Sequence, residues 1–255
     1  MSTAAQVLVL LGVGVLAGIV STVASLASVV SYPALLALGL PPVSANVTNT
    51  VALMFTAVGA TAGSRPELAG QGRRVRSLGL LTAAGGGAGA ALLLLTPARG
   101  FEYAAPVLIA VGSLAILRRP IALEPDVADA SGSSAAGGWL SRAEVFAVAV
   151  YIGYFGAAGG ILMLALLTRI FAQSLARTNA VKNVISGLAN AVAGIGFAIF
   201  GPVRWTAALP LAAGFLIGGW IGPALVRRLP AQGLRVFVGI CGLAVAIRLG
   251  FGTYG

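Results

Sequence analysis

The chain has 255 residues, of which 58% are hydrophobic and 9% are charged, and its mean hydropathy is +1.00. Soluble domains carry roughly 25% charged residues, so this chain has too little charge to cover a soluble globule. A single cysteine and the lack of histidine exclude a disulfide scaffold and the commonest metal ligands. The composition therefore predicts a membrane protein that is not an enzyme and that has no cofactor and no metal site.

The net charge of +10 does not indicate a nucleic-acid partner. The 16 basic residues lie in small groups between long apolar runs, as they do in polytopic membrane proteins, and no basic patch is interleaved with aromatic residues. The expected partners are the lipid bilayer and a small solute. The first apolar run, from Val7 to Leu26, lacks a basic leader and continues into apolar sequence, so a cleaved signal peptide is not expected.

Eight apolar stretches approach or exceed the roughly 20 residues that a bilayer requires. They cover residues 7–40, 46–63, 78–96, 101–117, 143–171, 180–200, 206–226 and 233–250. The first and the fifth are too long for one helix and too short for two, and serines, a proline or glycines interrupt them. Each is predicted to form a helix, a break and a shorter returning helix, with the irregular backbone buried in protein.

Two halves of the chain repeat. A shift of 133 residues places the first half on the second without a gap, so that Asn46 falls on Asn179 and Pro97-Ala98 on Pro230-Ala231. Such a register indicates an internal repeat. The predicted organisation is a first repeat over residues 1–117, a flexible cytoplasmic linker over 118–142 and a second repeat over 143–255.

The arginines indicate how the repeats are related. Segment 65–76 carries four arginines, whereas the equivalent segment of the second half carries only Arg204; the other loops show the reverse pattern. Because basic loops mark the cytoplasmic side, equivalent loops are expected on opposite sides of the membrane. The predicted fold is an all-α polytopic membrane protein with two inverted repeats, each a broken or re-entrant hairpin plus three transmembrane helices, with both termini outside. The alternative is eight simple helices in parallel repeats, which leaves one basic cluster, 65–76 or 227–235, on the wrong side.

Transporters with inverted repeats and broken helices hold their substrate near the membrane midplane. Helix N-termini at the breaks favour an anion there. The candidate binding residues at the breaks are Ser25, Ser28, Ser31, Tyr32, Gly159 and Gly160. The alternative is that these small residues only let helices pack closely.

A polar stripe opens the sixth stretch. Asn179, Lys182, Asn183, Ser186 and Asn190 share one helix face, which in a membrane helix must look at protein or water. Lys182 is the only lysine in the chain, and we expect it to attract an anion or to gate; the alternative is a lysine that snorkels to the interface. All six acids lie in loops or at the ends of stretches, so no conventional proton relay is predicted.

Glycine clusters occupy equivalent places in the third and seventh stretches. Gly85 to Gly89 in the first repeat and Gly214, Gly218 and Gly222 in the second are spaced as small-residue packing faces. They serve either the internal fold or a homodimer, and both alternatives stay open.

Two segments resemble the TauE/SafE sulfite exporter family. Residues 31–53, SYPALLALGLPPVSANVTNTVAL, are similar to its first signature, and residues 177–184, RTNAVKNV, look like the repeat copy. The resemblance implies a multi-pass transporter of the bacterial plasma membrane that exports sulfite or a small organosulfonate. It implies binding by the hairpin tips and by Asn46, Thr48, Asn49, Asn179, Lys182 and Asn183. A passive anion channel and a non-transporting assembly or scaffold protein are the alternatives.

The chain departs from the family at the first hairpin tip, which is usually rich in glycine. Here the tip reads Ser25-Leu-Ala-Ser28, so side chains replace open backbone. Either the substrate differs from sulfite, or serine hydroxyls replace backbone donors.

Overall fold

The computed structural model describes residues 3–118, 138–156 and 159–226, together with the single residues 240, 243 and 247. Most of the expected linker, the basic cluster at 227–235 and nearly all of the eighth apolar stretch lie outside the described residues. The described ranges contain ten helices and no strand. The helices are α1 (Thr3–Ala24), α2 (Ala27–Ala37), α3 (Pro42–Gly63), α4 (Arg65–Leu68), α5 (Gly72–Leu95), α6 (Ala98–Arg118), α7 (Trp139–Tyr154), α8 (Gly159–Ile170), α9 (Leu175–Phe200) and α10 (Trp205–Val226).

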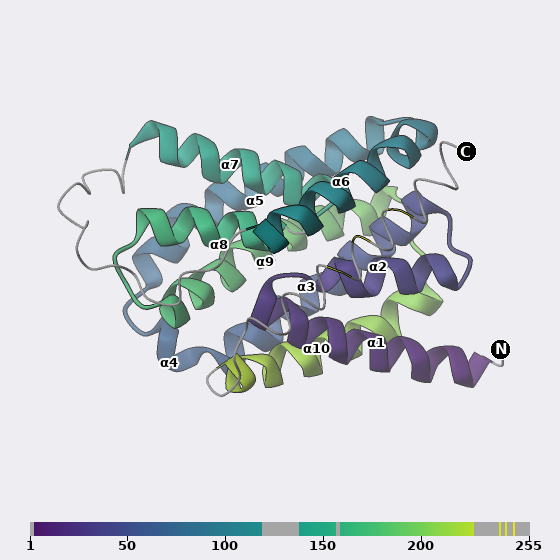
Figure 1. Ribbon diagram of the computed structural model, residues 1–255, viewed down its shortest axis with the longest axis horizontal. Helices are drawn as coiled ribbons and strands as arrows, with labels where there is room; N and C mark the ends of the chain where they lie inside the picture. Colours follow the sequence, from purple (N-terminus) through teal and green to yellow (C-terminus); the bar gives the residue numbers. More distant parts are fainter. Residues whose placement is uncertain are drawn as a thin grey trace.

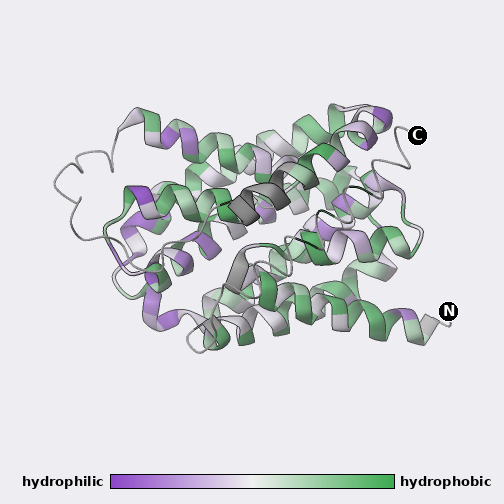
Figure 2. Cartoon of the chain, in the orientation of Figure 1, coloured by the Kyte–Doolittle hydropathy of each residue, from purple (hydrophilic) through white to green (hydrophobic). Residues whose placement is uncertain are grey.

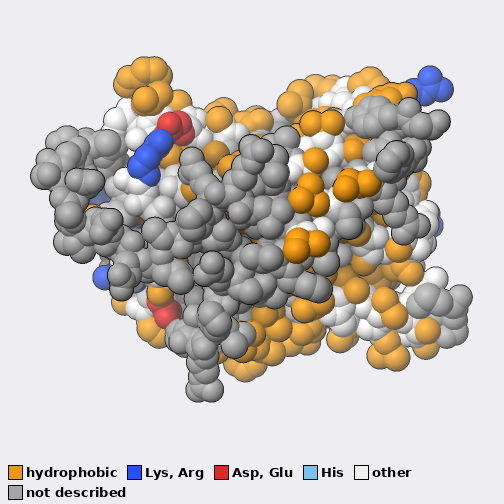
Figure 3. All heavy atoms as spheres, in the orientation of Figure 1, with side chains coloured by type: hydrophobic (Ala, Val, Ile, Leu, Met, Phe, Trp, Pro, Cys, Tyr) orange, Lys and Arg blue, Asp and Glu red, His pale blue; other side chains and the backbone are white. Residues whose placement is uncertain are grey.

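Five of these helices, α1, α3, α5, α9 and α10, are long and apolar enough to cross a membrane, and α2 and α8 are shorter apolar helices. Hydrophobic residues cover the outer helices in Figure 2, and large side chains such as Leu8, Leu80 and Ile199 are more than three-fifths exposed. Among the side chains that Figure 3 colours by type, most are apolar, and the charged ones lie near the two ends. Such a surface requires lipid rather than water around it, so the chain is a multi-pass membrane protein.

Both predicted breaks are confirmed. Helix α1 ends at Ala24 and α2 begins at Ala27, with Ser25 between them at a φ of 61°. Helix α7 ends at Tyr154 and α8 begins at Gly159, and Gly156 has a φ of 72°. These left-handed conformations interrupt the helices because a right-handed turn cannot continue through them. Two helices begin earlier than the apolar stretches predict. Helix α7 begins four residues before residue 143, where the fifth apolar stretch starts. Arg73, Arg74 and Arg76, which were expected in a loop, belong to the first turns of α5.

Helix boundaries and packing both follow the 133-residue shift. Adding 133 to Pro42 and Gly72, where α3 and α5 begin, gives 175 and 205, where α9 and α10 begin. Helix α10 packs on α1 and α3 of the first half, whereas α5 packs on α7 and α9 of the second. In Figure 1, α1 and α10 lie along the bottom, α5 and α7 along the top, and α3 and α9 between them. The two halves therefore interlock through equivalent contacts.

Hydrogen bonds at the two ends of α3 and α9 show how these central helices run relative to each other. Ser44 in the first turn of α3 donates to the carbonyl of Pro202, just past the end of α9, at 2.8 Å. Arg177 in the first turn of α9 donates to the carbonyl of Ala69, just past α4, at 2.8 Å. Helices α3 and α9, which the shift makes equivalent, therefore run antiparallel.

Both predicted glycine faces lie inside the fold. A Cβ on Gly14 would lie 2.9 Å from the Cα of Gly214, and one on Gly86 would lie 2.6 Å from the Cα of Ala189. Such separations leave no room for a side chain, so glycine allows α1 to meet α10 and α5 to meet α9. The glycine clusters thus serve internal packing of the chain.

Candidate substrate site

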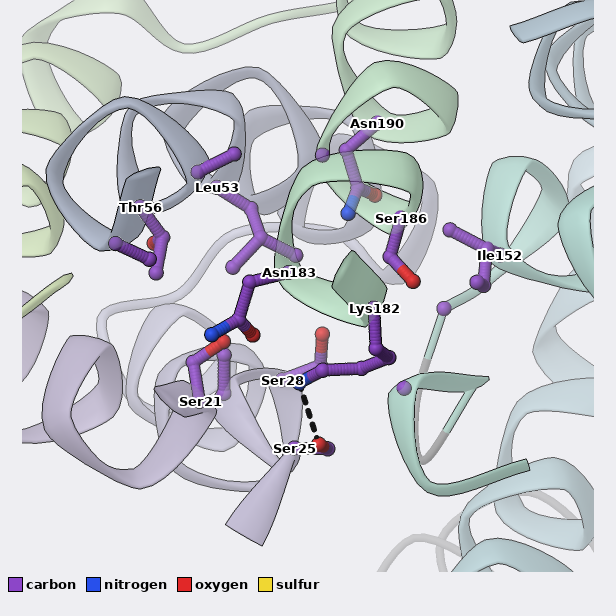
Figure 4. A pocket seen from close by; sticks show the side chains of 16 residues that line it. Ser21, Ser25, Ser28, Leu53, Thr56, Ile152, Lys182, Asn183, Ser186 and Asn190 are labelled. Atoms are coloured by element: carbon purple, nitrogen blue, oxygen red, sulfur yellow. Dashed lines mark hydrogen bonds between the residues drawn. The ribbon is translucent and has the colours of Figure 1, made fainter. Parts of the chain in front are cut away.

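A cavity of about 50 Å³ lies where the two breaks meet α3 and α9. Figure 4 shows Ser21, Ser25 and Ser28 on one side and Leu53 and Thr56 of α3 on another. Helix α9 contributes the polar stripe: Lys182, Asn183, Ser186 and Asn190. Since one water molecule requires about 10–15 Å³, the cavity has room for about four water molecules.

Lys182 is the one charged side chain that is buried among the described residues, with 2% of its surface exposed. Its Nζ donates to the Ser25 hydroxyl at 2.6 Å (Figure 4), so the side chain points into the protein and does not snorkel. No Asp or Glu in the described ranges is buried near it. Removing an ammonium group from water is costly without a counter-charge. An anion in the cavity would supply that charge.

Four polar atoms in the lining have no hydrogen-bond partner. They are Thr56 Oγ1, Asn183 Nδ2, Ser186 Oγ and Asn190 Oδ1. An unsatisfied buried polar group costs about 1–3 kcal/mol, so the site is built to be filled by a ligand or by water. Two hydroxyls and an amide nitrogen among the four can donate to the oxygens of an anion.

Two helix N-termini also meet at this cavity. Ala27 and Ser28 belong to the first turn of α2, and Gly160 belongs to the first turn of α8. The first amides of a helix have no partner within it, and the helix dipole makes this end positive. A Cβ on Gly160 would lie 2.8 Å from the Cβ of Ser25, so glycine at this position lets the two breaks approach each other.

The asparagines Asn46 and Asn179 do not line the cavity. Asn46 donates its amide to the carbonyl of Tyr154 at 3.0 Å, and Asn179 donates to the carbonyl of Thr22 at 2.9 Å. These carbonyls lie in the last turns of α7 and α1, where helical partners run out. Each asparagine thus caps the broken helix of the other half.

Other predicted residues lie next to the cavity and not in its lining. Asn49 donates to the Ser28 hydroxyl at 3.1 Å and accepts from Ser31 at 2.5 Å, so both residues orient Ser28. The Thr48 hydroxyl accepts from the backbone amide of Arg204 at 3.0 Å. The remaining two pack against apolar side chains, Tyr32 edge-on to Phe155 and Gly159 against Ile152.

Five of the twelve predicted residues therefore share the cavity: Ser25, Ser28, Gly160, Lys182 and Asn183. Ser186 and Asn190 join them, and the polar stripe already contained the signal for both. Ser21 precedes Ser25 by one helical turn, and Thr56 is an isolated polar residue in apolar sequence. Only the structure assigns these two to the cavity.

Long apolar helices, two helix breaks and a central polar cavity with a buried amine that has no counter-charge are typical of a multi-pass membrane transporter. The family model for the sulfite exporter TauE/SafE matches residues 10–249. The chain belongs to this family, whose members are transporters and not enzymes, and the resemblance seen in the sequence is confirmed. No curated protein and no solved structure matches the chain significantly.

Proposed function

We propose that the chain exports sulfite, or a sulfur oxyanion of similar size, across the bacterial plasma membrane. The observation that carries the proposal is the Lys182 amine, which is buried without a carboxylate beside unpartnered donors. Sulfite, with one sulfur and three oxygens, is small enough for a cavity of about 50 Å³. An organosulfonate adds a carbon skeleton, so we rank it below sulfite as a substrate.

The two walls of the cavity favour a pyramidal anion. Helix α9 provides the amine of Lys182 and the donors of Asn183 and Ser186, whereas α3 provides the apolar side chain of Leu53 beside the hydroxyl of Thr56. Sulfite carries its three oxygens on one side and a lone pair on sulfur on the other. Its oxygens would accept from the amine, amide and hydroxyl donors, and its lone pair would face Leu53. A tetrahedral sulfate would place an unsolvated oxygen against Leu53, which costs free energy.

Transport would proceed by alternating access between two inverted repeats. The antiparallel course of α3 and α9 and the exchanged packing of the halves support this arrangement. The α2 and α8 tips, which belong to different halves, would move relative to each other around the anion. By the positive-inside rule, the arginines around α4, α5 and the loop before α9 support a cytoplasmic position for that end.

The test is sulfite flux in proteoliposomes. Replacing Lys182 by alanine removes a charge that, about 4 Å from the anion at an effective dielectric of about 20, contributes up to about 4 kcal/mol. Even a third of this corresponds to about a tenfold loss of flux at low sulfite. Ser44→Ala is the matched control, because Ser44 is another buried polar residue whose hydroxyl bonds Pro202 away from the cavity.

Wild-type flux in Lys182→Ala would refute this site. If the rate of sulfite flux does not change when proton or sodium gradients are imposed, the protein is a passive anion channel and not a coupled exporter. Flux of sulfoacetate that matches the flux of sulfite would contradict the size argument.

A further inference from the structure

A second hollow, of about 450 Å³, opens at the end of the molecule that carries α4. The first turns of α5 and α7 and the residues that follow α8 enclose it. Three arginines line it, Arg73, Arg74 and Arg142, together with the hydroxyl-bearing Ser77. No Asp or Glu is part of this lining, and nearby Glu144 forms an ion pair with Arg169. The hollow is therefore strongly positive.

Neutral groups hold one of these arginines in place. Arg74 Nη1 donates to the side-chain oxygens of Gln71 at 3.0 Å and Gln173 at 2.5 Å. Its guanidinium lies 4.6 Å from the ring centroid of Phe171. Amide oxygens and a ring order the side chain but leave its charge uncompensated. Arg73, Arg74 and Arg142 are all exposed, and the pair Arg73 and Arg142 is called the rim.

A bilayer around the membrane-spanning helices would change from hydrocarbon to headgroups near this hollow. It adjoins the first turn of α5, a membrane-spanning helix, and Leu80 two turns further along is 72% exposed. Trp139, at the start of α7, is 80% exposed, and exposed tryptophan is typical of membrane interfaces. Arginines gather at this end, which favours the leaflet that is rich in anionic lipid.

We propose that this hollow binds the phosphate headgroup of an anionic phospholipid. Arg73 and Arg142 contact the phosphate from the rim, and the pre-ordered Arg74 supplies a third positive charge. The acyl chains then run along the exposed apolar faces of α5 and α7. This site is separate from the central cavity, and its occupation does not depend on the identity of the transported anion.

The experiment measures lipid retention on the full-length purified chain by native mass spectrometry. Phosphatidylglycerol and phosphatidylcholine with identical acyl chains are compared on the wild type and on Arg73→Gln/Arg142→Gln. The matched control is Arg99→Gln/Arg204→Gln, which removes the same charge from exposed arginines at the opposite end of the helices. Thermal unfolding in phosphatidylcholine nanodiscs establishes that all three proteins are folded.

We expect the wild type and the control to retain phosphatidylglycerol over phosphatidylcholine, and the rim variant to bind phosphatidylglycerol about tenfold more weakly. Equal retention of the two lipids by the wild type overturns the proposal, as does unchanged retention by the rim variant. Glycerol phosphate and inorganic phosphate form a further arm. If they displace the lipid at micromolar concentration, the site recognises a soluble phosphate and the lipid assignment is wrong.

Discussion

Ser25 combines an unfavourable backbone conformation with a hydroxyl in the candidate site, and two substitutions separate these effects. Its φ of 61° costs a residue with a side chain about 1–2 kcal/mol, whereas the second break has Gly156 in this region. Ser25→Gly removes that cost but adds unfolded-state entropy of about 0.5–1 kcal/mol. Ser25→Ala keeps the cost. Because both variants lack the hydroxyl, we expect Ser25→Gly to be more stable by about 1 kcal/mol.

The shared loss of the hydroxyl gives a second readout. Its oxygen accepts from Lys182 at 2.6 Å, and the lost bond to this buried amine costs about 1–3 kcal/mol in either variant. Unfolding in one detergent measures the stability difference, and sulfite flux in proteoliposomes measures the role of the hydroxyl. We expect both variants to transport at similarly reduced rates. Equal stability of the two would refute the backbone argument, and wild-type flux in both would remove Ser25 from the site.

Three further predictions concern packing, capping and selectivity. Gly86→Ala should destabilise the chain by about 1–3 kcal/mol, because the new methyl group would push α5 away from α9. Gly12→Ala is the control: no atom lies within 4 Å of the new Cβ, so this variant should be as stable as the wild type or slightly more stable. Equal melting temperatures of the two variants would contradict the close packing at Gly86. Asn46→Ala and Asn179→Ala should each cost about 1–3 kcal/mol, because each leaves a helix-end carbonyl unbonded. Reduced sulfite affinity at unchanged stability would instead make them ligand groups. Leu53→Ser should lower the preference for sulfite over sulfate in competition flux assays, and an unchanged ratio would contradict the two-wall cavity.

The breaks and the matching starts of equivalent helices could be predicted because each rests on a pattern within the sequence itself. A 34-residue apolar run with serines and a proline cannot form one straight membrane helix, and α1 and α2 divide it at Ser25. The 133-residue register needs no structural knowledge, and α9 and α10 begin where it places them. The helix face from Lys182 to Asn190 likewise follows from spacing alone.

The partners of buried polar groups could not be predicted in the same way. Polarity shows that Asn46 must find a partner in a membrane interior, but not that this partner is a carbonyl 108 residues away. The single small polar residues Ser21 and Thr56 look like the small residues that pack membrane helices. Only the meeting of α1, α3 and α9 decides that both face a cavity.

The repeats agree in the residues that hold the framework and differ in those that line the cavity. The capping asparagines fall on each other under the 133-residue shift, and the carbonyls that they bond differ by one position in this register. Lys182, in contrast, falls on Asn49 and Ser186 on Leu53. In the proposed alternating access the two halves of the framework would exchange roles, whereas the positive charge at the cavity comes from α9. We expect the anion to stay on α9 while the tips of α2 and α8 switch access around it. A structure of the opposite state with the anion held by α3 and not by Lys182 would contradict this.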